Sequence, residues 1–95
     1  MHAVVVHTNV TEEAQADPEY TVLRQQIIPA VQQAPGFVGG YFLAPVEGVG
    51  LAVVVFESED AARGAAGVMG VHPGGSVAPG TSIETVDFVE VLGVG

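Results

Sequence analysis

The segment over residues 50–56 constrains the fold most strongly, because its sequence, GLAVVVF, carries no polar side chain. Side chains in a β-strand point alternately to the two faces of the sheet. The odd-numbered and the even-numbered residues of this segment therefore lie on opposite faces, and both sets are apolar. A strand with one face in water alternates apolar and polar residues, so this pattern indicates a strand that is buried on both faces.

A strand that is apolar on both faces needs a layer of structure on each side. The first strand candidate, over residues 3–6 (AVVV), shows the same pattern, and the chain contains only two helix-like segments. Both helices would pack on one face of a single sheet, which leaves the other face without cover from its own chain. We therefore predict a homodimer that forms through the sheet face.

Length and charge narrow the class of protein. The 95 residues predict a single domain over residues 1–95. Eleven acidic residues stand against two basic ones, Arg24 and Arg63, for a formal net charge of −9. Two basic side chains cannot form a surface that contacts a row of phosphates. We therefore expect neither nucleic acids nor anionic membranes as partners.

Residue types that are missing exclude further classes of site. The chain has no cysteine, which excludes disulfides, thiol catalysis and cysteine-based metal sites. No apolar run approaches the roughly 20 residues of a membrane helix. The first residues, Met1-His2-Ala3, lack the basic start of a signal peptide. We therefore expect a cytoplasmic protein.

The order of the predicted elements gives the fold class. Strands are predicted over residues 2–8, 37–43, 50–56 and 81–92, with helices over residues 17–34 and 61–69. Asp17 and Ser58 are the expected caps of the two helices, and Pro29 should kink the first helix near Gln25. The order β-α-β-β-α-β predicts an α+β, ferredoxin-like fold, with a four-stranded antiparallel sheet and both helices on one face.

Two glycine-rich segments stand out within this pattern. Gly39-Gly40, inside the second predicted strand, suggests a bulge or a close approach by another backbone or a ligand. Residues 70–80 (GVHPGGSVAPG) read as a loop whose length is typical of functional or mobile segments.

Four segments carry a resemblance to a known family: AVVVHTNV, IIPAVQQAPGFVGGYFL, GLAVVVFESEDAA and SIETVDFVEV. Together they resemble the dimeric α+β-barrel superfamily and, within it, the antibiotic biosynthesis monooxygenase (ABM)-like domains of small actinobacterial members. The resemblance spans nearly the whole chain. It implies a homodimer whose sheets pack face to face, with a pocket between sheet and helices in each subunit. Members include cofactor-independent oxygenases of aromatic substrates, isomerases and haem-degrading enzymes.

His7 and His72 are the candidate catalytic residues. His7 ends the first strand on the face of Ala3 and Val5, and a neutral histidine can act as a general base near physiological pH. The competing interpretation is a partly buried histidine bonded to a backbone carbonyl. His72 follows the second helix and could equally be a solvated loop residue.

Haem binding and haem degradation are less favoured than the oxygenase, isomerase and binding-module functions. Haem-degrading members use an Asn on the first strand, a Trp, and a His after the second helix, and Asn9 and His72 loosely match two of these. The chain has no Trp, and it lacks the basic residues that usually pair with haem propionates. A metal site built from His7, His72 and Asp87 or Glu84 has no supporting ligand spacing, so neither a metal nor a cofactor is predicted.

The pocket is expected to be apolar, with few polar groups. Its candidate lining residues are Asn9, Tyr41, Phe42, Phe56 and Asp87. The leading functional prediction is a cofactor-independent monooxygenase or isomerase that acts on an apolar aromatic or polyketide-like small molecule. The alternative is a non-catalytic small-molecule-binding or assembly module, and the residues alone do not separate the two.

Overall fold

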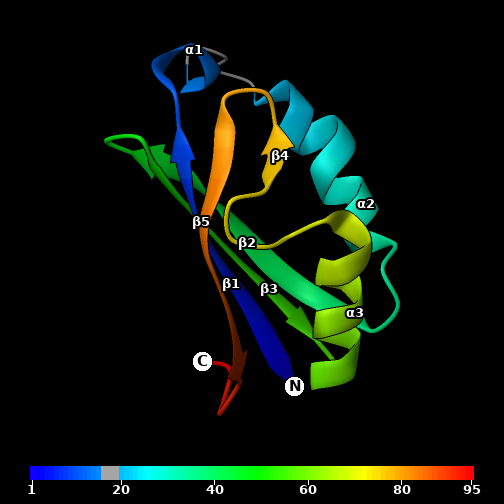
Figure 1. Ribbon diagram of the computed structural model, residues 1–95. Helices are drawn as coiled ribbons and strands as arrows, with labels where there is room; N and C mark the ends of the chain where they lie inside the picture. The colour runs from blue at the N-terminus through cyan, green and yellow to red at the C-terminus, as the bar shows by residue number, and fades with distance from the viewer. Residues whose placement is uncertain (16–19) are drawn as a thin grey trace.

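The computed structural model describes residues 1–15 and 20–95. It shows one curved antiparallel sheet in the strand order β2-β3-β1-β5-β4, and helices α2 and α3 lie on the same side of it (Figure 1). The strands are β1 (His2–Val10), β2 (Phe37–Val46), β3 (Val49–Phe56), β4 (Ser76–Ala78) and β5 (Thr81–Glu90). The helical segments are α1 (Glu12–Gln15), η1 (Leu23–Ile27), α2 (Ile28–Gln32) and α3 (Glu59–Met69).

The α+β class and the antiparallel sheet with helices on one face agree with the prediction, but the sheet has five strands rather than four. The additional strand, β4, lies inside the segment that was predicted to be only a loop. Its Ser76 hydroxyl donates to the carbonyl oxygens of Ala78, at 2.9 Å, and Thr81, at 2.8 Å. Three residues are too few to show a strand period, so the sequence pattern could not reveal this element.

The first predicted helix differs most from expectation. Its predicted start at Asp17 lies outside the described residues. From Leu23 to Ile27 the chain forms a π-helix, and the backbone N–H of Ile28 bonds to the carbonyl of Leu23, five residues earlier. Pro29 has no N–H for the carbonyl of Gln25, and its ring crowds that carbonyl. The kink predicted near Gln25 therefore takes the form of a π-turn.

The turn between β2 and β3 is shorter than residues 44–49, the connection that the predicted strand bounds leave between them. Strand β2 runs on to Val46, and the turn consists of Glu47 and Gly48, with φ of 52° and 80°. Two successive positive φ angles are typical of the two-residue turns that join antiparallel strands. The pairing register shifts between Phe37 and Gly39, which places a bulge just before the glycine pair.

The core lies between the helices and one face of the sheet. Strand pairing aligns Val4 with Val54 and Phe88 on that face, and Val4 and Val54 pack against Val31 of α2 and Ala62 of α3. The opposite face, which we call the open face, carries the row Tyr41, Val53, Val5 and Asp87 across the sheet. No described helix covers the open face (Figure 1).

Among the described residues, no helix combines the length and the hydrophobicity that crossing a lipid bilayer requires.

Candidate ligand-binding pocket

A cavity of about 670 Å³ lies between the sheet and the helices. Its floor is the helix-facing side of the sheet, where Val6 of β1 pairs with Ala52 of β3, and Ala52 pairs with Phe42 of β2. Its walls come from the helices, with Ile27, Val31, Ala65, Ala66 and Met69. This volume lies within the range of about 300–1,000 Å³ that is typical of small-molecule sites.

Small residues create the space for this cavity. Gly40, Gly50 and Ala52 lie on its floor, and Ala65 and Ala66 of α3 lie on its wall. Where larger side chains such as Phe56 and Val54 meet the helices, the same layer closes into the core. The cavity therefore continues the core toward the end of the sheet that carries Thr8.

Polar side chains are few around the cavity. Apart from Tyr41, which belongs to the open face, the described lining residues with polar side chains are Thr8, Glu13, Tyr20, Arg24 and Thr81, and no lining residue is a histidine. Tyr20 and Arg24 are joined by a backbone hydrogen bond, in which the N–H of Arg24 donates to the Tyr20 carbonyl at 2.9 Å. The charged groups of this set are Glu13 and Arg24, and both residues are exposed.

His7 lies on the open face, on the opposite side of the sheet from the cavity. Its Nδ1 is 3.0 Å from the hydroxyl oxygen of Thr85, its neighbour on β5. Along β1, His7 stands between Val6 and Thr8, which both line the cavity on the other face of the sheet. A reaction at His7 would therefore need a substrate bound on the open face.

His72 lies in the connection between α3 and β4, where it is exposed. Its Nδ1 is 3.0 Å from the carbonyl oxygen of Pro73, and the residue does not line the cavity. The fold thus does not bring His7 and His72 together, and a catalytic role for either remains a prediction.

The five predicted pocket residues divide into two groups. Phe42 and Phe56 line the cavity from the helix-facing side of the sheet, whereas Tyr41 borders it only as part of β2, because Tyr41 pairs with Val53 in the row of the open face. Asn9 lies within β1 rather than after it, and it borders a separate shallow hollow beside the β2–β3 turn. Asp87 is exposed on the open face. Contact of any of these residues with a ligand remains a prediction.

Sequence reasoning missed Arg24 and Met69 as cavity residues. The signal for Arg24 was its place beside the apolar positions of the first helix, Leu23 and Ile27. Met69 was recognised only as the end of the second helix, because which side of that helix faces a cavity depends on tertiary packing.

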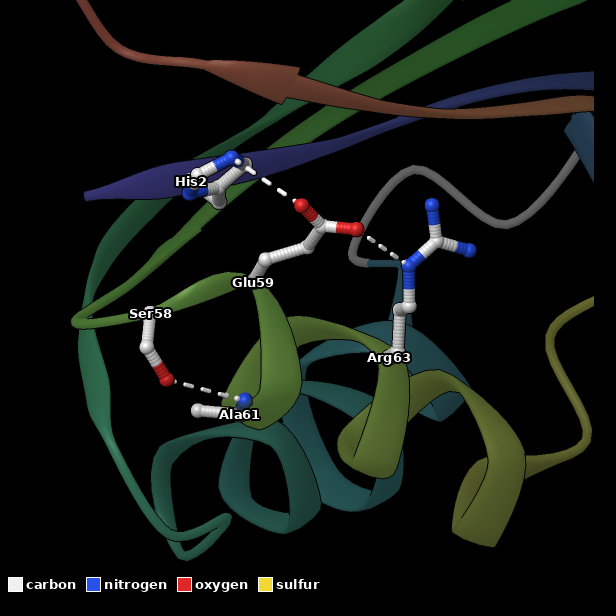
Figure 2. A network of polar contacts seen from close by, with 5 residues as sticks. All are labelled: His2, Ser58, Glu59, Ala61 and Arg63. Atoms are coloured by element: carbon white, nitrogen blue, oxygen red, sulfur yellow. Dashed lines mark hydrogen bonds and ion pairs between the residues drawn. The ribbon is translucent and has the colours of Figure 1, made fainter.

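The second basic residue, Arg63, belongs to a polar network away from the cavity (Figure 2). Its Nε donates to the Glu59 carboxylate at 2.7 Å, and Nε2 of His2 lies 3.6 Å from the same carboxylate. The hydrogen bond from Arg63, with its charge, lowers the pKa of Glu59 below the ordinary value of 4.5. The guanidinium carbon also lies 4.4 Å from the centre of the Phe88 ring.

No cluster of three histidine, aspartate or glutamate side chains that could hold a metal ion occurs in residues 1–15 and 20–95.

Comparison with known proteins gives one group of structural neighbours. No family model and no curated protein matches the chain. The neighbours are solved structures of MhuD, a haem-degrading protein from Mycobacterium tuberculosis. The structure with two haems bound in its active site has a TM-score of 0.71 and 25% identity, over 100% of both chains.

A MhuD variant with two manganese protoporphyrin IX molecules per active site is similar at a TM-score of 0.70 and 26% identity, over 100% of this chain and 99% of that one. A haem-free, cleaved form has a TM-score of 0.62 and 26% identity, over 100% of both chains. These likenesses support the resemblance to the ABM-like superfamily.

Proposed function

We propose that this protein binds a planar, largely apolar molecule of the porphyrin class in the cavity between its sheet and its helices. The observation that carries the proposal is the cavity itself, about 670 Å³ in volume, with apolar side chains over most of its wall. Full-length structural neighbours hold haem or manganese protoporphyrin in their active sites. This reverses the order that the sequence suggested, in which haem ranked below an aromatic or polyketide-like ligand.

The residues on the wall suit a porphyrin ring. Val6, Ala52 and Phe42 offer a continuous apolar surface on the floor, and burying apolar area is the main favourable term in such binding. Met69 and Tyr20 also line the cavity, and thioether and phenol groups are both known ligands of haem iron.

Oxidation of the bound molecule is a second part of the proposed function, separate from binding. Bound haem would supply the oxygen chemistry through its iron, and the chain would bury the ring and exclude water. The chain lacks the Trp of haem-degrading members, and the described cavity wall carries no histidine. A cofactor-independent monooxygenase or isomerase acting on an aromatic or polyketide-like molecule would use the same cavity, as would a non-catalytic binding module.

A titration with haemin and with zinc protoporphyrin IX tests the proposal. We expect saturable binding of both, seen as a shift of the Soret band. In Ala52→Leu the larger side chain fills the floor of the cavity, and we expect affinity to fall by about tenfold or more, the equivalent of about 1.4 kcal/mol. The matched control is Val53→Leu, because the next residue of β3 points to the open face and should leave affinity unchanged.

Two results would contradict this function: no saturable binding of either porphyrin, or equal affinities in the two variants. Circular dichroism checks that both variants fold, since overpacking can cost about 1–3 kcal/mol. Loss of the Soret band after a reductant and oxygen are added would identify a haem-degrading enzyme. A stable spectrum would identify a binding module.

We also propose that the protein is a homodimer that assembles through the open face. Val5 and Val53, in the middle of this face, are flanked by Leu43 and Tyr41 of β2, whose exposed fractions are 50% and 74%. Since α2 and α3 both lie on the other side, a second copy is the most economical cover for this apolar surface.

A further inference from the structure

We infer that the phenolate oxygen of Tyr20 is the protein ligand of the metal when the cavity holds a ferric porphyrin. The inference rests on the proposed function and narrows its preferred ligand to porphyrins that carry a hard, trivalent metal ion. Three observations support it: the backbone of Tyr20, the unbonded phenol of this residue on the cavity wall, and the apolar character of that wall.

The first observation is the backbone of Tyr20, which has a φ of 50°, in the left-handed region that bulky side chains rarely adopt. The residue directly precedes the helical segment that begins at position 21, and its carbonyl accepts the hydrogen bond from the N–H of Arg24. A helix usually starts at a residue with an extended backbone and a short polar side chain, and Tyr20 has neither. Unfavourable backbone angles of this kind cluster at ligand sites, so we assign the tyrosine to ligand binding rather than to helix capping.

The second observation is that the phenol of Tyr20 has no partner within the described residues. Tyr20 lines the cavity and is half-buried, yet no hydrogen bond, ion pair or ring contact in residues 1–15 and 20–95 engages its side chain. It also stands outside the hydrophobic core cluster. The phenol is therefore available to an occupant of the cavity, and tyrosine is one of the side chains that ligate haem iron.

The third observation is the apolar wall, which favours an anionic ligand of the metal over a neutral one. A porphyrin ring that has lost its inner protons carries two negative charges, so a ferric ion at its centre leaves one positive charge. An unpaired charge among apolar side chains is strongly unfavourable. When the phenol loses its proton to water and its oxygen bonds to the iron, the metal, the ring core and the ligand together become neutral.

The other candidate ligands on the described wall are Met69 and Glu13. Met69 is a neutral thioether, which would leave the positive charge in place, and it already packs against the core cluster. Glu13 is exposed, and its carboxylate would have to give up its hydration to enter the apolar interior. Tyr20 is therefore the residue that combines an available oxygen with a negative charge in the bound state.

The test compares haemin with metal-free protoporphyrin IX, which has the same ring and the same carboxylates but no metal to ligate. We expect the wild-type protein to bind haemin about tenfold more tightly, with the visible charge-transfer band that phenolate-bound ferric iron produces. Tyr20→Phe keeps the aromatic ring of the side chain and removes its oxygen. This variant should lose both the preference and the band, while it still binds the metal-free porphyrin.

The reduction potential of the bound haem gives a second readout. A phenolate stabilises ferric over ferrous iron, so Tyr20→Phe should raise the potential. Met69→Leu is the matched control, because it removes the thioether with little change in volume and should leave the preference, the band and the potential unchanged. A thioether ligand raises the potential, so a fall of the potential in Met69→Leu would identify Met69 as the ligand and overturn the inference.

The remaining outcomes separate this inference from the proposed function. Equal affinities of the wild-type protein for haemin and the metal-free porphyrin would overturn this inference alone and leave porphyrin binding in place. A preference for haemin that Tyr20→Phe retained would do the same. Binding of neither compound would overturn this inference and the proposed function together.

Discussion

Gly39 and Gly40, adjacent in β2, differ in the space that a side chain would find. A Cβ on Gly40 would lie 2.8 Å from the carbonyl oxygen of Val53 and 3.2 Å from the Cα of Val54, whereas a Cβ on Gly39 would meet nothing within 4 Å. Gly40→Ala should therefore lower the free energy of unfolding by about 1–3 kcal/mol, because two backbones must separate. Gly39→Ala should raise it by up to about 1 kcal/mol, because it restricts the unfolded chain.

Urea unfolding of the two glycine variants measures this difference. Equal stabilities would show that β2 and β3 are not packed as closely as the structure has them. The sequence predicted a bulge or a close approach at the glycine pair, but it could not say which glycine makes a close approach. That depends on the register with β3, and a shift of one residue exchanges the faces.

The Glu59 carboxylate should make the stability of the protein depend on pH. Its pKa is lowered, mainly by the hydrogen bond from Arg63. The stabilisation it contributes is therefore present above the unfolded-state pKa and is lost as pH falls through the lower folded-state pKa. Arg63→Gln should raise the pKa of Glu59 toward 4.5. His2→Gln should raise it less, because the His2 charge is the smallest of the lowering influences.

An NMR titration of the Glu59 side-chain carboxyl carbon in the wild-type protein and the two variants follows these midpoints. An unchanged midpoint in Arg63→Gln would contradict the assigned cause.

Helix α3 is the element whose start is determined most locally. The Ser58 hydroxyl oxygen accepts a hydrogen bond from the backbone N–H of Ala61 at 3.1 Å, and Ser58→Ala should cost about 1 kcal/mol of stability. Ser58→Asp should retain most of that stability, because a carboxylate can accept the same bond and suits the positive end of the helix. Thermal or urea unfolding measures both, and equal losses in the two variants would rule out a capping role.

The same contrast explains which elements the sequence could predict. Helix α3 and the long strands follow from caps and apolar periods that lie within each segment. Strand β4 depends on its pairing with β5, and the π-turn of η1 depends on how the chain re-forms hydrogen bonds around Pro29. The position of Arg24 on the cavity wall depends on how that helical segment stands over the sheet, which no local pattern encodes.

At the scale of the whole molecule, the alternation along β3 predicted that each face of the sheet needs cover. The described helices cover one face, and His7 lies on the other. The sequence could predict a pocket between sheet and helices from its family resemblance. It could not separate the candidate site residues between the two faces, because two histidines 65 positions apart in the chain (7 and 72) carry no information on their distance in space.

Adjacent valines of β3 test the proposed assembly. Val54 is 7% exposed and belongs to the core under the helices, so Val54→Asp buries an unpaired carboxylate. That penalty, several kcal/mol, is comparable with the whole stability of a small protein, and the variant should unfold. Val53 points to the open face, between Tyr41 and Val5. Val53→Asp should therefore remain folded but become monomeric, because the carboxylate would be buried only in the dimer. Circular dichroism reports the fold, and native mass spectrometry reports the number of subunits. A Val53→Asp variant that remained a dimer would place the interface elsewhere, and a monomeric wild-type protein would show that the apolar open face is not a contact between copies of this chain.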